Sequence, residues 1–317
     1  MQARNGFTIT ELLIAMLLGL FLLAMALTAF SSLSRSAKQT QQIAELQQNG
    51  QFILSLMQNE LQNMGFWGGR ADVLLAATTT KPDAPSPDCL NDSIDNGSFP
   101  SVDQGFVTLY AKPVNSGRQL SCIPSALKDS ELLQLKRLIG QSQPVGTLKS
   151  NRFYLETDWQ HSRFVSAASS GLQAEMNYYP YQHLVFYVQK QYRDGESVPV
   201  LMRKRLIRNA SGHANIATDS IIDGVERLHF EFGIDADNDG SIDYQQATAE
   251  MTDLQWQQQH SRIVSIKFYA LLRALKQDRQ YSNNDVYSMG PHSFNADGDH
   301  YRRLLISSTV FFHNSQL

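Results

Sequence analysis

Cysteine is scarce in this chain of 317 residues, which contains two, and the two do not have the C-x-x-C spacing of metal centres or redox pairs. Catalytic motifs are missing as well. We find no H-E-x-x-H, G-x-S-x-G or P-loop pattern, and no pair of acids that could be placed in a pocket. The sequence therefore predicts no catalytic residues and a protein that is not an enzyme.

An excess of charge of either sign is also lacking. The 27 Lys and Arg residues nearly balance the 30 Asp and Glu residues, for a formal net charge of −3. The chain thus has no basic footprint for nucleic acid, and no specific nucleic-acid partner is predicted. A mean hydropathy of −0.29 excludes a polytopic membrane protein, and 16 Phe, 12 Tyr and 3 Trp exclude a disordered chain.

Charged residues are absent from Leu12 to Ser34, and the apolar part of this segment, residues 12–30, is long enough to cross a bilayer as one helix. A secretory signal peptide is a weaker interpretation, because no A-x-A-like cleavage site follows and a helical pattern continues past the apolar run. A buried core helix is rarely apolar over such a length. We therefore predict a single N-terminal membrane helix. Arg4 before it favours a cytoplasmic N-terminus and an exported body.

Glu11 lies at the very start of this apolar segment, where a carboxylate needs a partner. Two interpretations are open. Glu11 is either an ordinary helix-end residue that gains from the helix dipole, or it pairs with a positive group that another molecule supplies.

The helix is predicted to continue well beyond the membrane. No proline occurs before Pro82, and apolar residues between Arg35 and Met64 recur mostly at spacings of three or four. This pattern predicts one helix over residues 7–64, whose second half lays its apolar face on a globular head. Gly50 is its weak point, at a cost of about 1 kcal/mol against Ala. A cluster of glycines at positions 65, 68 and 69 is predicted to end it.

The N-terminal residues carry a resemblance to a known family. Gly6-Phe7-Thr8-Ile9-Thr10-Glu11, followed by the apolar run, resembles the prepilin signature of type IV pilins and pseudopilins. The resemblance implies that residues 1–6 are a leader, that prepilin peptidase cuts between Gly6 and Phe7, and that the new Phe7 amine is methylated. Glu11 would then neutralise the Phe7 amine of a neighbouring subunit in a filament.

The remainder of the chain resembles the PilW group of minor pilins, within the class of type IV pilin-like proteins. Gln51 and Gln62 stand where arginine is common in that group, so no role of those arginines carries over. The resemblance implies an α+β fold, with a long N-terminal helix packed on a globular head that contains an antiparallel β-sheet. Phrases typical of the group occur in the same order, at residues 46–52, 63–68, 181–188, 198–205, 222–226, 230–233 and 301–303.

The resemblance further implies a minor pilin that takes part in initiation and assembly of the pilus at its tip, in support of twitching motility, adhesion or DNA uptake. Its partners would be other minor pilins, the major pilin, prepilin peptidase, the inner membrane and a PilY1-like tip adhesin. The head would lie in the periplasm before assembly and at the pilus or cell surface afterwards. Two alternatives stay open: a pseudopilin of type II secretion, and a membrane-anchored surface binding module outside any filament.

The head, residues 65–317, divides into two parts of different composition. Residues 70–130 are rich in Pro, Ser, Asp, Asn and Gly, which predicts irregular structure. They include Cys89 and Cys122, and two cysteines in an exported head suggest one disulfide, the alternative being two free thiols. Residues 131–317 carry short β-rich segments separated by turn signals, which predict an antiparallel sheet. These segments are residues 131–138, 152–156, 184–188, 200–207, 228–232, 264–268 and 304–312.

One acidic motif in the head has the pattern of a metal-binding loop. Oxygen-bearing side chains alternate with other residues, and a glycine at the sixth position allows a sharp turn, as in calcium loops. A structural calcium ion is therefore predicted. Its ligands would be the carboxylates of Asp235, Asp237 and Asp239, the backbone carbonyl of Ser241, and Asp243 directly or through water.

The motif departs from an EF-hand at its twelfth position, where Gln246 replaces the bidentate Glu. Calcium would then bind more weakly, or Glu250 would complete the set. The alternative is an acidic hairpin tip, since Asp-Gly is also a turn signal. Four carboxylates so close together, however, repel one another without a cation.

Three other features are predicted to be structural. Residues 295–299, a shorter acidic phrase, are predicted to form a turn. The eight histidines are scattered without metal-ligand spacing, and each is interpreted as a packing or surface residue. A basic patch formed by Arg203, Lys204, Arg205 and Arg208 is interpreted as a solvated strand edge rather than a DNA-binding or partner-binding surface.

Overall fold

The computed structural model describes residues 8–68, 80–91, 93–101, 105–115, 117–158, 161–193 and 195–312. The predicted leader and Phe7 lie outside these residues, as does Gly69. The chain forms two compact units, Met1–Gln48 and Asn49–Leu317, which are described separately below.

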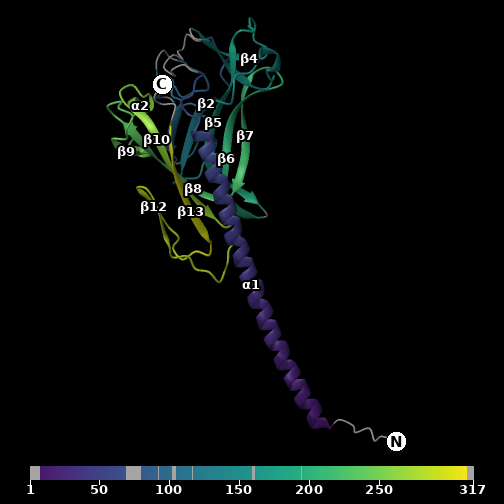
Figure 1. Ribbon diagram of the computed structural model, residues 1–317. Coiled ribbons are helices and arrows are strands. Elements are labelled where there is room, and N and C mark those ends of the chain that lie inside the picture. Colours follow the sequence, from purple (N-terminus) through teal and green to yellow (C-terminus); the bar gives the residue numbers. More distant parts are fainter. Residues whose placement is uncertain are drawn as a thin grey trace. The chain divides into compact units, whose positions relative to one another are not determined.

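One long helix, α1 (Ile9–Leu61), begins in the first unit and ends in the second (Figure 1). From Leu12 to Leu33 its large apolar side chains are exposed; Phe21, for example, is 62% exposed and Phe30 72%. Within the described part of the chain, α1 is the one helix long and apolar enough to cross a membrane, and its apolar window has no buried residue. The first unit therefore presents an apolar surface that the protein does not cover.

The last turns of α1 belong to the head and are amphipathic. Ile53, Met57 and Leu61 follow one another at a spacing of four residues and are fully buried. A Cβ atom at Gly50 would lie 3.2 Å from Leu304 Cδ2 and 3.3 Å from Ile306 Cγ2, so the glycine allows close approach of a strand. Gly50 lowers the helix propensity of α1, but the absence of a side chain there lets α1 pack closely against Leu304 and Ile306.

The described residues of the head form two large antiparallel sheets and one hairpin (Figure 1). The first sheet has seven strands: β1 (Leu109–Pro113), β2 (Glu131–Leu138), β3 (Phe153–Thr157), β4 (Ser162–Ser166), β5 (Asn177–Arg193), β6 (Glu196–Arg208) and β7 (Ala214–Asp223). The second has four, in the order β13 (Arg303–Phe311), β10 (Arg262–Arg273), β8 (Val225–Asp235) and β9 (Tyr244–Ala247). Strands β11 (Val286–Met289) and β12 (His292–Asn295) form the hairpin, and α2 (Asp253–Trp256) is a single short turn.

This architecture confirms the predicted α+β class, with a long apolar helix followed by an antiparallel β head. Each predicted β segment overlaps a strand, and residues 131–138 coincide with β2. The predicted strand edge at the basic patch is wrong, because β6 pairs with β5 on one side and β7 on the other. Arg203 and Arg205 instead form ion pairs with Asp219 of β7.

Strand β8 is the main contact between the two sheets, since β2, β5 and β6 all contact it. Its Leu228, Phe230 and Phe232 are fully buried. Where β9 no longer pairs with β8, the side chains of Ser130, just before β2, and Glu131, its first residue, accept from the β8 backbone. Ser130 Oγ accepts from Leu228 N at 3.0 Å, and Glu131 Oε2 accepts from Phe230 N at 2.8 Å. The sheets are therefore joined by hydrogen bonds as well as by apolar packing.

The predicted disulfide is present between Cys89 and Cys122, which are both buried. The pair is 33 residues apart in the sequence. Closing a loop of that size lowers the entropy of the unfolded chain and stabilises the fold by roughly 3–4 kcal/mol. The disulfide therefore fixes part of the segment for which the sequence predicted irregular structure, and in which β1 is the one strand among the described residues.

A buried polar network holds the chain beside the disulfide. Asp88 accepts hydrogen bonds from Ser98 Oγ at 2.6 Å and Ser98 N at 2.7 Å. Because the Ser98 hydroxyl hydrogen goes to Asp88, His183 Nδ1, 2.9 Å away, must carry the hydrogen and donate to Ser98 Oγ. His183 Nε2 then lies 2.7 Å from Gln134 Nε2. Burial, together with the nearby charge of Lys136, places the pKa of His183 well below its ordinary value.

Lys136 is the fully buried cation next to this network. Its Nζ donates to the Val107 carbonyl and lies 4.7 Å from the ring centre of Phe106. Burial lowers the pKa of Lys136 to about 7, although the charges of Asp88 and Asp95 oppose the shift. The ammonium is therefore close to losing its proton at neutral pH.

The pKa of Lys136 predicts a rise in stability with pH. The unfolded chain keeps the Lys136 proton up to a pH of about 10.5, whereas the folded chain releases it at about 7. Between these values the unfolded state binds more protons, so the free energy of unfolding should increase by up to about 1.4 kcal/mol per pH unit. Lys136→Met should lack this increment.

Urea unfolding of the full chain in detergent, followed by circular dichroism between about pH 7 and 9, measures the effect. Lys149→Met is the matched control, because Lys149 is exposed. Parallel pH profiles for the wild type and Lys136→Met would contradict the assignment.

Candidate functional site

The N-terminus of α1 is closed by a capping box formed by Thr8 and Glu11. Glu11 Oε2 accepts from Thr8 N and from Thr8 Oγ1, both at 2.9 Å, and Glu11 N donates to Thr8 Oγ1 at 3.3 Å. The carboxylate is thus held at the positive end of the helix dipole. Its second oxygen, Oε1, takes no part in the capping box.

The acidic motif forms the loop between β8 and β9, and it brings three of the predicted ligands together. One carboxylate oxygen each from Asp235, Asp237 and Asp239 lies within 4.8 Å of the others. Asp235 is buried, while Asp237 and Asp239 are exposed. Gly240 has a φ of 90°, as the sharp turn of such a loop requires.

Backbone N–H groups already donate hydrogen bonds to several oxygens of these carboxylates. Asp239 N donates to Asp235 Oδ1 at 3.2 Å, Gly240 N to Asp235 Oδ2 at 2.9 Å, and Ser241 N to Asp239 Oδ1 at 2.7 Å. The loop thus has a defined shape in which the carboxylates face a common centre. The donors reduce the repulsion among the three charges without supplying a cation.

Asp243, a further predicted ligand, does not join this group of carboxylates. Asp243 Oδ2 accepts from Ala236 N at 2.7 Å, which directs it to the start of the loop. The side chain of Gln246 is engaged by the Glu250 carbonyl and by Gln255. A calcium ion bound here would need further oxygen ligands from water, from backbone carbonyls or from a shift of Asp243.

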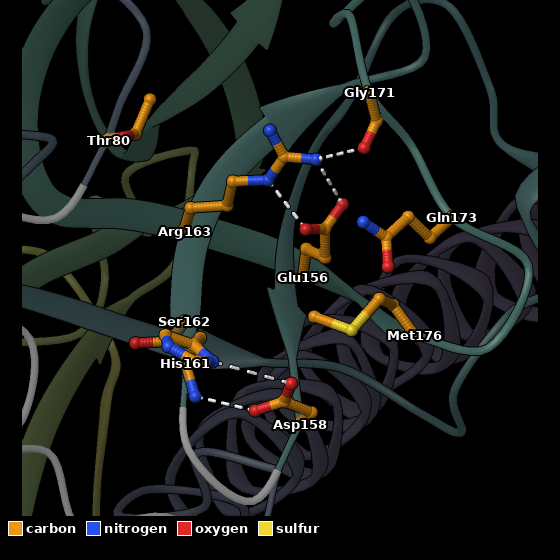
Figure 2. A pocket seen from close by; sticks show the side chains of 9 residues that line it. All are labelled: Thr80, Glu156, Asp158, His161, Ser162, Arg163, Gly171, Gln173 and Met176. Carbon is orange, nitrogen blue, oxygen red and sulfur yellow. Dashed lines mark hydrogen bonds and ion pairs between the residues drawn. The ribbon is translucent and has the colours of Figure 1, made fainter.

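A hollow of about 410 Å³ opens beside β3 and β4, and its lining is mainly polar (Figure 2). Figure 2 shows Arg163 facing Glu156; its Nη2 donates to Glu156 Oε2 at 2.9 Å and to the Gly171 carbonyl at 2.7 Å. This hydrogen bonding to Glu156 is the main cause that raises the pKa of Arg163. The guanidinium is therefore engaged within the protein, and nothing in this lining indicates a reactive group.

Two of the phrases that resemble the PilW group meet at a buried ion pair. Arg303 Nε donates to Glu226 Oε2 at 2.7 Å, and Nη1 donates to Asp299 Oδ1 at 2.8 Å. Burial would lower the pKa of Arg303, but the hydrogen bonds to Asp299 and Glu226 outweigh it and raise the pKa. The predicted turn at residues 295–299 is present: Asp299 N donates to the Ala296 carbonyl at 3.0 Å, and Asp297 and Gly298 have positive φ angles.

Gly224 lies beside this ion pair and has a structural reason to be glycine. Its φ is 94°, and a Cβ atom there would lie 2.8 Å from the Arg273 carbonyl oxygen. Gly224 O in turn accepts from Arg273 N at 2.7 Å. The phrase at residues 222–226 is therefore explained by close packing of the β7–β8 corner on β10 rather than by a ligand.

Sequence reasoning missed one group of ionisable residues. Glu131 of β2, His229 of β8 and His292 of β12 come together in the head, with one ligand atom of each within 4.8 Å of the others. In the sequence each histidine stands alone. One signal was available in the sequence: His229 stands between Leu228 and Phe230 in a strongly apolar strand. In the structure His229 is buried, as its two neighbours are.

Two family models match the chain. The prokaryotic N-terminal methylation motif matches residues 1–27, and the type IV pilus-assembly protein W model matches residues 185–314, which run from β5 to β13 and beyond. No curated protein and no solved structure matches the chain significantly.

The exposed apolar helix, the methylation motif and the antiparallel β head define the class, that of the type IV pilin-like proteins. Within this class, the two matches are those of a PilW-type minor pilin of the type IV pilus. Both families consist of structural components of pilus assembly rather than enzymes. The apolar helix and the motif fit anchoring in a membrane and assembly into a pilus.

Proposed function

We propose that the protein is a minor pilin that prepilin peptidase cleaves between Gly6 and Phe7, with methylation of the Phe7 amine, and that α1 then packs among the helices of other pilins. The observation that supports this proposal is an N-terminal methylation motif joined to an apolar helix whose side chains are exposed. Such a surface is stable in lipid or against other apolar helices, but not in water.

Glu11 has a defined part in this proposal. In a filament the carboxylate would lie among apolar helices, where an unpaired charge is costly. The new amine at Phe7 of a neighbouring subunit is the cation that offsets this cost. The capping box uses Oε2, so Oε1 can accept from that amine without loss of the helix cap.

Variants of Glu11 separate the cap from the charge. Glu11→Gln keeps a side-chain acceptor for Thr8 but removes the charge, whereas Glu11→Ala removes both. If the charge pairs with a neighbouring amine, both variants should abolish piliation of cells, counted by electron microscopy. Normal piliation of Glu11→Gln cells would contradict the charge-pairing role.

Mass spectrometry of the mature N-terminus provides the control. The two Glu11 variants should still begin at a methylated Phe7, and Gly6→Ala should remain uncleaved. An unprocessed N-terminus in wild-type cells would reject the pilin proposal and favour a membrane-anchored binding module.

We further propose that the head lies in the periplasm before assembly, and that the subunit takes part in initiation and stays at the pilus tip. The disulfide fits an oxidising compartment such as the periplasm. The matched family is described as an assembly protein, and in a filament that grows by addition at the membrane, the first subunits end at the far tip. There the head would join other minor pilins, the major pilin and a PilY1-like adhesin, in support of twitching motility, adhesion or DNA uptake.

Immunogold labelling tests the tip position. An epitope tag in the turn between β6 and β7, at exposed Ser211, should place gold at one end of sheared pili. A tag on the major pilin should label the same filaments along their length. Gold spread along the shaft of filaments that carry the Ser211 tag would contradict a tip subunit.

We also propose that the β8–β9 loop binds a structural calcium ion. Support comes from the three converging carboxylates, the turn at Gly240 and the repulsion among like charges that a divalent cation would relieve. The exposed position of Asp237 and Asp239 is consistent with weak binding, in the range of about 10⁻⁴–10⁻³ M typical of extracellular modules.

Calcium should therefore stabilise the full chain in detergent. At a concentration about five times Kd, the gain in unfolding free energy is about 1 kcal/mol, or a rise in Tm of about 2–4 °C. Asp237→Asn should remove the rise, while Asp297→Asn, in the turn at residues 295–299, should keep it. No heat in calorimetry at millimolar calcium and no rise in Tm would reject the site.

A further inference from the structure

Three side chains from distant parts of the sequence converge where the two sheets meet the β11–β12 hairpin. Glu131 is the first residue of β2, His229 lies within β8, and His292 is the first residue of β12. Glu131 Oε1 lies 3.3 Å from His292 Nε2 and 3.5 Å from His229 Nδ1. A zinc ion bound at about 2.0–2.2 Å holds tetrahedral ligands about 3.3–3.6 Å apart, so these separations suit a shared ion.

The three converging atoms lack hydrogen bonds. Glu131 Oε1, His229 Nδ1 and His292 Nε2 are all buried, and none has a hydrogen-bond partner among the described residues. Buried polar groups are nearly always paired, and Glu131 is only 1% exposed. Three such atoms within 4.8 Å of one another therefore indicate a missing ligand rather than three separate defects.

The carboxylate of Glu131 is already held in a fixed orientation. Its other oxygen, Oε2, accepts from Phe230 N at 2.8 Å and from Thr248 Oγ1 at 2.7 Å. Hydrogen bonds of this kind orient the ligands of metal sites. They leave Oε1 as the atom that faces the two imidazoles.

The two imidazoles favour a metal over a pair of protonated histidines. Their rings are stacked, with centres 4.1 Å apart and planes at 23°, so two positive charges would repel strongly at this separation. A neutral imidazole presents the lone pair that a metal binds. His292 is about one-third exposed, so the cluster lies close to the surface of the head.

We propose that Glu131, His229 and His292 bind one divalent transition-metal ion, with zinc as the best fit, and that the ion fastens the β11–β12 hairpin to both sheets of the head. Two imidazoles and one carboxylate suit zinc and its neighbours in the transition series, whereas calcium and magnesium prefer sites built wholly from oxygen. The proposal is independent of filament assembly and of the acidic loop.

Zinc titration of the metal-stripped full chain in detergent, in competition with a chromophoric zinc indicator, tests the proposal. The wild type should bind one equivalent, and His292→Gln should weaken binding by at least about 10-fold, the effect of losing even an outer-shell partner. Glu131→Gln should do the same while it keeps an acceptor for Phe230 N and Thr248. Far-ultraviolet circular dichroism verifies that each variant folds.

Two control variants locate the ion. His213→Gln changes an exposed histidine, and Asp237→Asn changes the acidic loop; both should bind zinc as the wild type does. Cobalt in place of zinc should give the visible absorption of a four-coordinate site in the wild type but not in His292→Gln. Equal zinc affinity for wild type and His292→Gln, or failure of the wild type to bind one equivalent, would overturn the proposal.

Discussion

The apolar surface of α1 is the constraint on which the rest of the structure depends. From Leu12 to Leu33 its large side chains are exposed, so this part of the protein is stable only in lipid or among other apolar helices. The unit that forms the head begins at Asn49, so only the last turns of α1 belong to it. The head must build its own core from strands, and only the last turns of α1 enter that core.

Strand β8 is central to this core because both of its faces are buried. Its apolar face packs through Phe230 and Phe232, and its other face places His229 against the start of β2. Polar groups from β2 and from the C-terminal strands then pair with it: Glu131 takes a backbone donor of β8, and Arg303 takes the carboxylate of Glu226. Because each of these groups is buried, removing one partner leaves the other unpaired, which is costly.

The predictions that succeeded rest on patterns within one segment. The spacing of apolar residues predicted α1 beyond the membrane, and the run at residues 131–138 predicted β2. The two cysteines predicted the disulfide because a pair offers a single pairing. Strand β7 was missed because its side chains are exposed or half-buried throughout, so no apolar alternation marks it. The pairing of β7 with β6 also explains why the basic patch is not a strand edge.

The candidate sites differ in how far a local pattern can reveal them. The carboxylates of Asp235, Asp237 and Asp239 converge within one loop, so their spacing alone predicts the cluster. The capping box at Thr8 and Glu11 likewise lies within a single helical turn. Glu131, His229 and His292 converge through the pairing of strands in three separate parts of the head. No spacing rule predicts this cluster, because the two histidines and Glu131 come close together only when β2, β8 and β12 pack in the folded head.

The two clusters also place different demands on a cation. Asp237 and Asp239 are exposed, so water and salt screen their repulsion and backbone amides satisfy much of the loop. At Glu131 Oε1 neither screening by water nor a hydrogen bond offsets the charge, because the residue is buried and the atom lacks a hydrogen-bond partner among the described residues. A charged carboxylate in that position is destabilising unless a positive charge adjoins it. The acidic loop can therefore fold without an ion, whereas the proposed metal ion would supply the positive charge that Glu131 needs.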